Sequence, residues 1–197
     1  MFGLIKKIIG GINMSHEVMV KEAMKTNLAI VKQSITVLDA AKLMKKRKIG
    51  NVLVVEKKQP IGILTESDIL KKVVAEGKNA KDVIVKDVMS TPVVVIDPYR
   101  NLEEAMKIMG KCNVRRLPVV EKNELIGIIT QKDISRISPV LHEISREWYD
   151  ITARDEAYFK MQVFSGKCED CGILSANLKN IEGRLLCDDC IDALKYE

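Results

Sequence analysis

The pattern of hydrophobic and polar positions in this chain repeats itself with an offset of 65 residues. Positions 20–69 align with positions 85–134 without a gap and share 18 identities in 50. Most of the other pairs exchange one residue for a similar one, so that apolar positions in the first copy meet apolar positions in the second. Internal similarity at a fixed spacing indicates a duplicated structural unit.

Each copy has the same predicted order of secondary structure. A short apolar run, long enough for a strand, is followed by apolar residues at helical spacing within 37–44 and 102–109. Two β-rich runs separated by a polar turn come next, and a second helix begins near Ser67 and Lys132. The predicted strands are Leu28 to Val31, Asn51 to Val55 and Ile61 to Leu64 in the first copy, and Val93 to Ile96, Leu117 to Val120 and Ile126 to Ile129 in the second.

This order defines a β-α-β-β-α unit and places the chain in the α/β (α+β) class. A unit of about 60 residues buries too little surface to be stable alone, so we expect the two copies to pack together.

The last strand of each copy enters the following helix through the motif Gly-hydrophobic-hydrophobic-Thr-x-x-Asp, at residues 62–68 and 127–133. A helix N-terminus offers free backbone N–H groups and a positive dipole, which favour an anion. An aspartate at this point can accept hydrogen bonds from both hydroxyls of a ribose, and a threonine hydroxyl can reach a phosphate. Thr-x-x-Asp is also a capping box, in which each side chain satisfies a backbone N–H group. The two roles do not exclude each other.

The duplicated unit and its motif resemble the cystathionine-β-synthase (CBS) domain family, whose members occur as tandem pairs called Bateman modules. The resemblance covers about residues 18–138 and implies two repeats, at 18–80 and 81–138, packed about a pseudo-twofold axis. It implies clefts that bind adenosine-containing ligands of the AMP, ADP, ATP or S-adenosylmethionine class. It also implies that two modules associate as a homodimer.

The resemblance assigns the ligand contacts to two threonine–aspartate pairs and two arginines: Thr65, Asp68, Arg115, Arg116, Thr130 and Asp133. The forked guanidinium group of arginine suits phosphate oxygens. The first copy has Gly50 and Asn51 where the second has its two arginines, so we expect unequal sites. The apolar stretches 29–31 and 94–96 are candidates for the wall that contacts adenine.

Beyond the repeats, residues 140–160 carry apolar side chains at three- and four-residue steps, which predicts a linker helix within 139–163. Residues 164–197 then contain four cysteines in the spacing C-x2-C-x15-C-x2-C, namely Cys168, Cys171, Cys187 and Cys190. This spacing is typical of a tetrahedral metal site, and so short a segment folds poorly without an ion.

The four-cysteine segment resembles zinc-ribbon and rubredoxin-like modules, in spacing more than in sequence. Four sulfurs in a tetrahedron accept Zn2+ or Fe, and their closed coordination leaves no position for a catalytic water. Ile191 follows the last cysteine where a strict rubredoxin match needs glycine. Disulfides or reactive thiols are the alternative to a metal. Cys112, within the second repeat, is expected to be a small buried apolar residue.

The amino-acid composition limits the classes of function that this chain can have. Hydrophobic residues make up 47% of the chain, and the net charge is +5. No stretch reaches the roughly 18 apolar residues that cross a bilayer, and residues 1–17, of which 1–13 are amphipathic and basic, are expected to form a tail. Paired cysteines favour a metal site in a reducing cytoplasm. Acidic residues beside both cysteine pairs would repel the phosphate backbone of a nucleic acid.

The sequence contains no P-loop, no dinucleotide-binding glycine fingerprint and no nucleophile with a partner base, so an enzyme is not expected. It favours a regulatory protein that senses an adenosine-containing ligand, with the four-cysteine segment or a protein partner reading the change. Two alternatives stay open. One is a rubredoxin-like iron electron carrier that the repeats regulate, and the other is a zinc-ribbon adaptor for nucleic acid or a transcription component.

Overall fold

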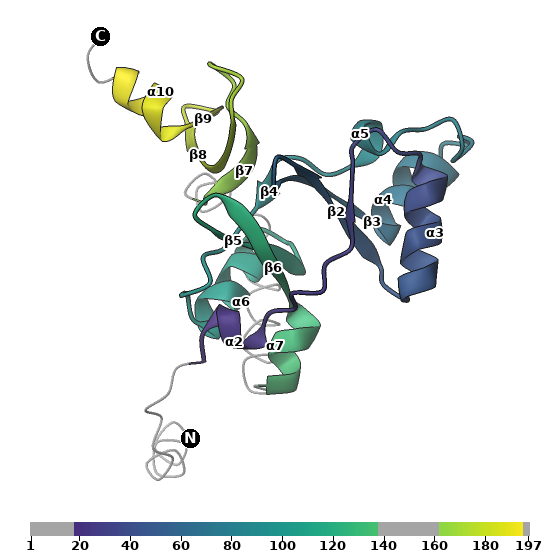
Figure 1. Ribbon diagram of the computed structural model, residues 1–197, viewed down its shortest axis with the longest axis horizontal. Coiled ribbons are helices and arrows are strands. Elements are labelled where there is room, and N and C mark those ends of the chain that lie inside the picture. Colours follow the sequence, from purple (N-terminus) through teal and green to yellow (C-terminus); the bar gives the residue numbers. More distant parts are fainter. Residues whose placement is uncertain (1–17, 138–161, 195–197) are drawn as a thin grey trace, which may run out of the picture.

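The computed structural model describes residues 18–137 and 162–194 (Figure 1). The expected tail at 1–17 and nearly all of the expected linker helix lie outside these residues. Within the described ranges, no helix is long and apolar enough to cross a membrane. The figure shows the two repeats beside each other, with the segment of residues 162–194, called here the four-cysteine module, next to β4 and β5.

Both repeats have the predicted β-α-β-β-α order, which confirms the fold class. The first consists of α2 (Val20–Ala23), β1 (Ile30–Val31), α3 (Val37–Arg47), β2 (Asn51–Glu56), β3 (Gln59–Thr65), α4 (Glu66–Ile69) and the π-helical turn η1 (Leu70–Val74). The second consists of α5 (Val85–Val88), β4 (Val93–Val94), α6 (Leu102–Lys111), β5 (Arg116–Glu121), β6 (Glu124–Thr130) and α7 (Gln131–Ile137). The short helices α2 and α5 were not predicted.

The first strand of each repeat is shorter than the apolar run that predicted it. β1 pairs in parallel with β2 at two positions only, Ile30 with Leu53 and Val31 with Val54. In the second repeat, the corresponding contact between Ile96 and Val119 is an isolated parallel bridge outside β4. β4 instead pairs with the strand Phe164–Lys167 of the four-cysteine module, and Ala29 packs in the core of the first repeat.

Local side-chain chemistry explains where the long helices begin and end. The Thr36 hydroxyl accepts a hydrogen bond from the backbone N–H of Asp39 at the start of α3, and the Asn101 side chain accepts one from Glu104 at the start of α6. These N-caps satisfy donors that the helix leaves unpaired. α3 ends at Lys48, whose left-handed backbone (φ 54°) stops the helix.

The two β-hairpins are built alike. β2 and β3 are antiparallel and connected by Lys57 and Lys58, and β5 and β6 are connected by Lys122 and Asn123. All four connecting residues have positive φ, which matches the right-handed twist of the flanking strands. Each hairpin also has a register shift at the same place, between the two valines in the middle of its first strand.

A short segment of each repeat pairs with the hairpin of the other repeat. The backbone of Lys25, in the first repeat, makes two hydrogen bonds of 2.9 Å with Ile128 of β6. The backbone of Ser90, which occupies the equivalent place in the second repeat, makes two with Ile63 of β3, at 3.0 and 2.8 Å. Each repeat thus adds a bridge to the hairpin of the other, and this crossover fixes their relative position.

The glycine of the repeated motif is required by this crossover. A Cβ atom on Gly62 would lie 2.4 Å from the Sδ atom of Met89, and one on Gly127 would lie 2.4 Å from the Sδ atom of Met24. Both methionines belong to the opposite repeat. The absence of a side chain therefore lets the segment before each first strand lie flat on the neighbouring hairpin.

The four-cysteine module consists of β7 (Phe164–Lys167), β8 (Leu174–Ile181), β9 (Arg184–Leu186) and α10 (Asp188–Ala193). β4 of the second repeat pairs antiparallel with β7, so that these strands form one sheet in the order β4-β7-β8-β9. Phe164, Leu178 and Leu186 are buried in the same core cluster as Leu117 and Ile129 of the second repeat. The module is therefore built onto the second repeat.

Candidate functional site

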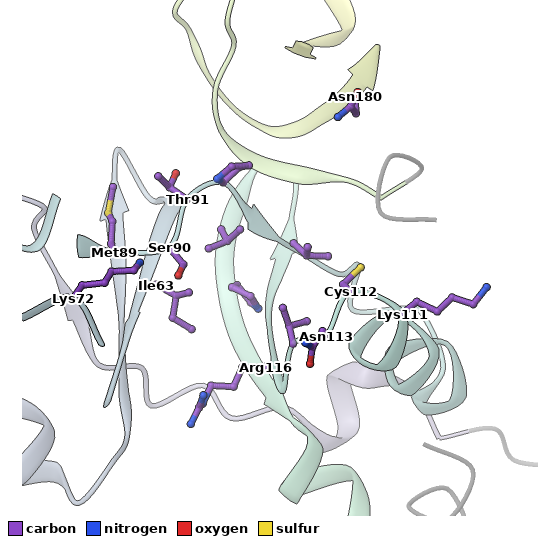
Figure 2. Close-up of a pocket in the computed structure, with 15 residues that line it drawn as sticks. Ile63, Lys72, Met89, Ser90, Thr91, Lys111, Cys112, Asn113, Arg116 and Asn180 are labelled. Atoms are coloured by element: carbon purple, nitrogen blue, oxygen red, sulfur yellow. The ribbon is translucent and has the colours of Figure 1, made fainter. Parts of the chain in front are cut away.

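A cavity of about 710 Å3 opens between the two repeats. Residues of the first repeat (Ile63, Lys72) line it on one side, and residues of the second (Asn113, Arg116) line it on the other, with the segment 89–94 between them (Figure 2). Asn180 of the four-cysteine module also lines it. The cavity combines apolar valine and proline side chains with cationic groups, a composition suited to an organic anion.

Asp68 is anchored by the capping box that the sequence predicted. Its Oδ2 atom accepts hydrogen bonds from the Thr65 hydroxyl (2.6 Å) and the Thr65 backbone N–H (3.0 Å), while its own N–H donates to the Thr65 hydroxyl (3.2 Å). The other oxygen, Oδ1, accepts from the Ser90 hydroxyl and from the Lys72 ammonium group, each at 3.0 Å. One oxygen therefore holds the helix, and the other faces two residues that line the cavity.

These contacts keep Asp68 ionised. Burial acts to raise its pKa, but the hydrogen bonds from Thr65 and Lys72 outweigh burial, and the net pKa is lower than the ordinary value. An ionised carboxylate is an acceptor only, which is what a pair of ribose hydroxyl donors requires.

Asp133 repeats the arrangement with a different cation. The Thr130 hydroxyl donates to its Oδ2 atom (2.5 Å), and the Asp133 N–H donates back to that hydroxyl (3.3 Å). Oδ1 pairs with the ammonium group of Lys25 at 2.6 Å. Burial raises the pKa of Asp133, but the bonds from Lys25 and Thr130 bring the pKa below its ordinary value. Each predicted aspartate is thus both a helix cap and one half of an ion pair.

The two cations come from different positions of the repeat. Lys25 corresponds to Ser90 in the second repeat, and Lys72 corresponds to Ile137. The sites are therefore unequal in the placement of charge as well as in the arginines. Ser90 and Lys72, which contact the Oδ1 atom of Asp68, line the described cavity, whereas Thr65, Asp68 itself and Lys25 are not among its lining residues. Lys25, Ser90 and Lys72 were not among the predicted site residues; of the three, only Lys72 had a local signal, because it lies four residues after Asp68, the spacing of a helical ion pair.

Arg116 lies at the start of β5 and lines the cavity. Burial lowers the pKa of its guanidinium group, the charge of Arg115 lowers it further, and the carboxylates of Glu66 and Asp68 oppose both effects. The electrostatic partners of Arg116 thus lie in the first repeat, across the cavity. Arg115 is exposed and is not among the residues that line this cavity.

The remaining residues singled out in the sequence differ in whether they line the cavity. Of the two apolar stretches proposed as adenine walls, Val94 lines the cavity, and Val93 beside it does too. Cys112 is buried, and burial raises the pKa of its thiol to about 11, so it is a neutral side chain. It also lines the cavity, which the sequence did not indicate.

The four-cysteine module brings its sulfur atoms into one cluster. The Sγ atoms of Cys168 and Cys190 lie 3.7 Å apart, as do those of Cys171 and Cys187, and all four lie within 4.8 Å of one another. A tetrahedral site with metal–sulfur bonds of about 2.3 Å has edges of about 3.8 Å. The cysteines are free thiols, so this spacing fits a four-coordinate metal ion and not a pair of disulfides.

The acid–base properties of the cluster also favour a cation. Burial acts to raise the pKa of Cys168, but N–H donors such as that of Cys187, 3.4 Å from its sulfur, bring it down to about 6. Hydrogen bonds with Cys171 and Cys187 raise the pKa of Cys190 to about 12. Without a metal ion, the cluster thus favours one thiolate and opposes a second. A bound metal ion would offset the negative charge of the thiolates.

The two cysteine pairs sit on different backbone structures. Gly172, with φ +70°, turns the chain after the first pair, and its N–H donates to the Cys168 carbonyl (3.0 Å). The second pair begins α10, with Cys187 as its N-cap, so no glycine is needed after Cys190. Nearby acidic residues are partly neutralised, because Asp170 pairs with Arg184 and Asp188 with Lys179, each at 2.8 Å.

Comparison with known proteins places the two repeats in a family. A model of the CBS domain matches residues 20–75 and 85–139. An uncharacterized protein of Methanocaldococcus jannaschii is 38% identical over 183 residues, covering 89% of this chain and 94% of the relative. One of Methanopyrus kandleri is 35% identical over 170 residues, covering 80% and 82%.

A solved structure shares the architecture of the repeats. It is a CBS domain pair in complex with 5′-methylthioadenosine and S-adenosyl-L-methionine, 26% identical, with a TM-score of 0.57. The likeness covers 62% of this chain and 96% of that one. Since the family model matches more than half of the sequence, once in each copy, the chain belongs to the CBS-domain family as a tandem pair.

Proposed function

We propose that this protein is a regulatory sensor that binds an adenosine-containing ligand in the cavity between its repeats. The observation that carries the proposal is the position of Asp68: its ionised carboxylate is held by the cap, and its Oδ1 atom contacts Ser90 and Lys72, which line the cavity. A structural neighbour that binds 5′-methylthioadenosine and S-adenosyl-L-methionine supports the ligand class.

Each part of the ligand has a matching group. Asp68 accepts hydrogen bonds from the ribose hydroxyls, with the Ser90 hydroxyl beside it. Lys72, 42% exposed and linked to the Val88 carbonyl (2.8 Å), can turn toward a phosphate, and Arg116 offers a fixed charge opposite. Val93 and Val94 supply the apolar surface for the base. Of the sequence candidates, we assign Asp68, Thr65 and Arg116 to this site, and Thr130, Asp133 and Arg115 to an unequal second one.

Sensing requires that the ligand favour one arrangement of the repeats over another. The ligand spans groups from both repeats, so its binding affects their relative position. The proposed function includes no catalytic residues. The proposed assembly is a homodimer.

We further propose that the four cysteines hold one metal ion, Zn2+ or Fe, and that the module transmits the ligand signal. When bound, the ion supplies a closed structural centre that ties the two cysteine pairs together. Cys168 and Cys171 hold it from the β7–β8 turn, and Cys187 and Cys190 hold it from the start of α10.

Calorimetric titration of the metal-loaded protein with AMP, ADP, ATP and S-adenosylmethionine tests the ligand proposal. At least one of the four is expected to bind saturably with a stoichiometry set by the working sites. If none binds at millimolar concentration, the repeats are a scaffold and the aspartates are helix caps only.

A further inference from the structure

The four-cysteine module contacts both repeats at once. Its core is shared with the second repeat, as the burial of Phe164 and Leu178 in that cluster shows. On the other side, Leu174 of β8 packs against the core cluster of the first repeat. β3 of the first repeat also lies in contact with β7 and β8. The module therefore connects the two repeats that enclose the cavity.

The same module forms part of the cavity's border. β7 pairs with β4, where Val93 lies opposite Ser165, and Val93 lines the cavity. A Cβ atom on Gly166 would lie 3.6 Å from the Cβ of Pro92, which also lines it. Asn180, on the β8–β9 hairpin, also lines the cavity, and its Oδ1 atom accepts a hydrogen bond from the Gly183 N–H (2.9 Å).

The path from the sulfur cluster to the cavity is short. Cys168 directly follows β7, and its N–H donates to the Ile173 carbonyl (2.9 Å), next to Leu174. An ion bound to Cys168 and Cys171 therefore fixes both the end of β7 and the start of β8. Without an ion, a module of this size has too little core of its own to hold these strands in place.

We infer that the four-cysteine module is a third wall of the ligand cavity, so that metal loading sets the cavity's affinity for its ligand. This inference rests on the proposed function, because it concerns the regulation of the same site. Linkage makes the effect reciprocal: if metal tightens ligand binding by some factor, ligand tightens metal binding by the same factor.

The test compares full-length protein in metal-loaded and chelator-treated forms, with AMP and S-adenosylmethionine as probes. Metal removal is expected to weaken binding of the responsive probe at least about fivefold, the lower end of typical coupling between sites. Saturating probe is expected to tighten metal binding, measured by competition with a chromogenic chelator, by the same factor. Hydrogen exchange at Val95, whose N–H donates to the Val163 carbonyl (3.2 Å), is expected to accelerate on metal removal.

A variant that keeps the metal separates bridging from general unfolding. L174A removes the Leu174 side chain from the core cluster of the first repeat and leaves the contacts of β3 with β7 and β8, so the metal-loaded variant is expected to bind the probe more weakly than metal-loaded wild type. I173A is the matched control, because Ile173 is its neighbour and 61% exposed; it is expected to behave as wild type.

Either of two results overturns the inference while leaving the proposed function intact: equal probe affinity with and without metal, or wild-type affinity in L174A. If metal-loaded wild type binds none of AMP, ADP, ATP and S-adenosylmethionine, the proposed function itself fails and this inference fails with it.

Discussion

The hydroxyl of Ser90 donates a hydrogen bond to the Oδ1 atom of Asp68 over 3.0 Å, which joins the second repeat to the carboxylate of the first repeat's motif. This contact follows from the crossover in which the Ser90 backbone bridges Ile63 of β3. A ligand that engages Asp68 therefore also acts at the boundary between the repeats.

G62A is expected to destabilise the protein by about 1–3 kcal/mol, as is usual for overpacking, because the new Cβ atom would lie 2.4 Å from the Sδ atom of Met89. Chemical denaturation measures the loss. In an M89A background the same substitution is expected to cost less, since the clash is gone. An equal cost in both backgrounds would contradict the proposed role of this glycine.

D68N is expected to lower stability at neutral pH, and this difference should shrink in acid. Hydrogen bonds from Thr65 and Lys72 keep the folded-state pKa of Asp68 below the ordinary value of 3.8. Its stabilising effect is therefore fully present above that value and is lost as the pH falls through the lower, folded-state pKa. Denaturation at pH 7 and pH 3 measures this. D82N, at an exposed aspartate, is the control and is expected to show no such trend.

R116Q is expected to weaken binding of phosphate-bearing ligands about tenfold or more, in line with the loss of a charged hydrogen bond. Binding of adenosine, which has no phosphate, should change little. R136Q is the control, because Arg136 is exposed, lies outside the cavity lining and belongs to neither proposed site. Equal losses for AMP and adenosine would show that Arg116 acts through structure and not through phosphate contact.

C171S is expected to remove the metal and lower the melting temperature of the module, because three thiolates hold the ion far less tightly than four. Elemental analysis of wild type should give one metal ion per chain. The protein should be colourless if the ion is zinc and coloured if it is iron. C112S, which changes a buried cysteine away from the cluster, should leave the metal content unchanged. Full metal content in C171S would exclude the four-sulfur centre.

Much of this structure could be predicted from the sequence, because its signals are local or duplicated. Helical and strand periodicity depends on neighbouring residues, and it predicted the β-α-β-β-α order of both repeats. The capping contact between Thr65 and Asp68 lies within one helical turn, so the motif alone indicated it. The cysteine spacing likewise predicted that four sulfur atoms would meet.

The rest depends on how distant segments meet. Nothing in Val93 or Val94 indicates that β4 pairs with β7 rather than forming a longer ladder with β5. Arg116 and the carboxylates of Glu66 and Asp68 come from different repeats, so only the fold brings their charges together. No role for Lys25 was predicted, since only the fold brings it to Asp133, whereas Lys72 lies four residues after Asp68, so helical spacing alone could have indicated that pair.

The most direct test of the central claim is calorimetry of metal-loaded wild type, D68N and D133N with the tightest-binding member of the AMP, ADP, ATP and S-adenosylmethionine panel. The account predicts saturable binding that D68N weakens about tenfold or more, the expected loss for one charged hydrogen bond, while D133N retains binding at the first site. Wild-type affinity in D68N would contradict it, because the carboxylate beside the cavity would then take no part in holding the ligand.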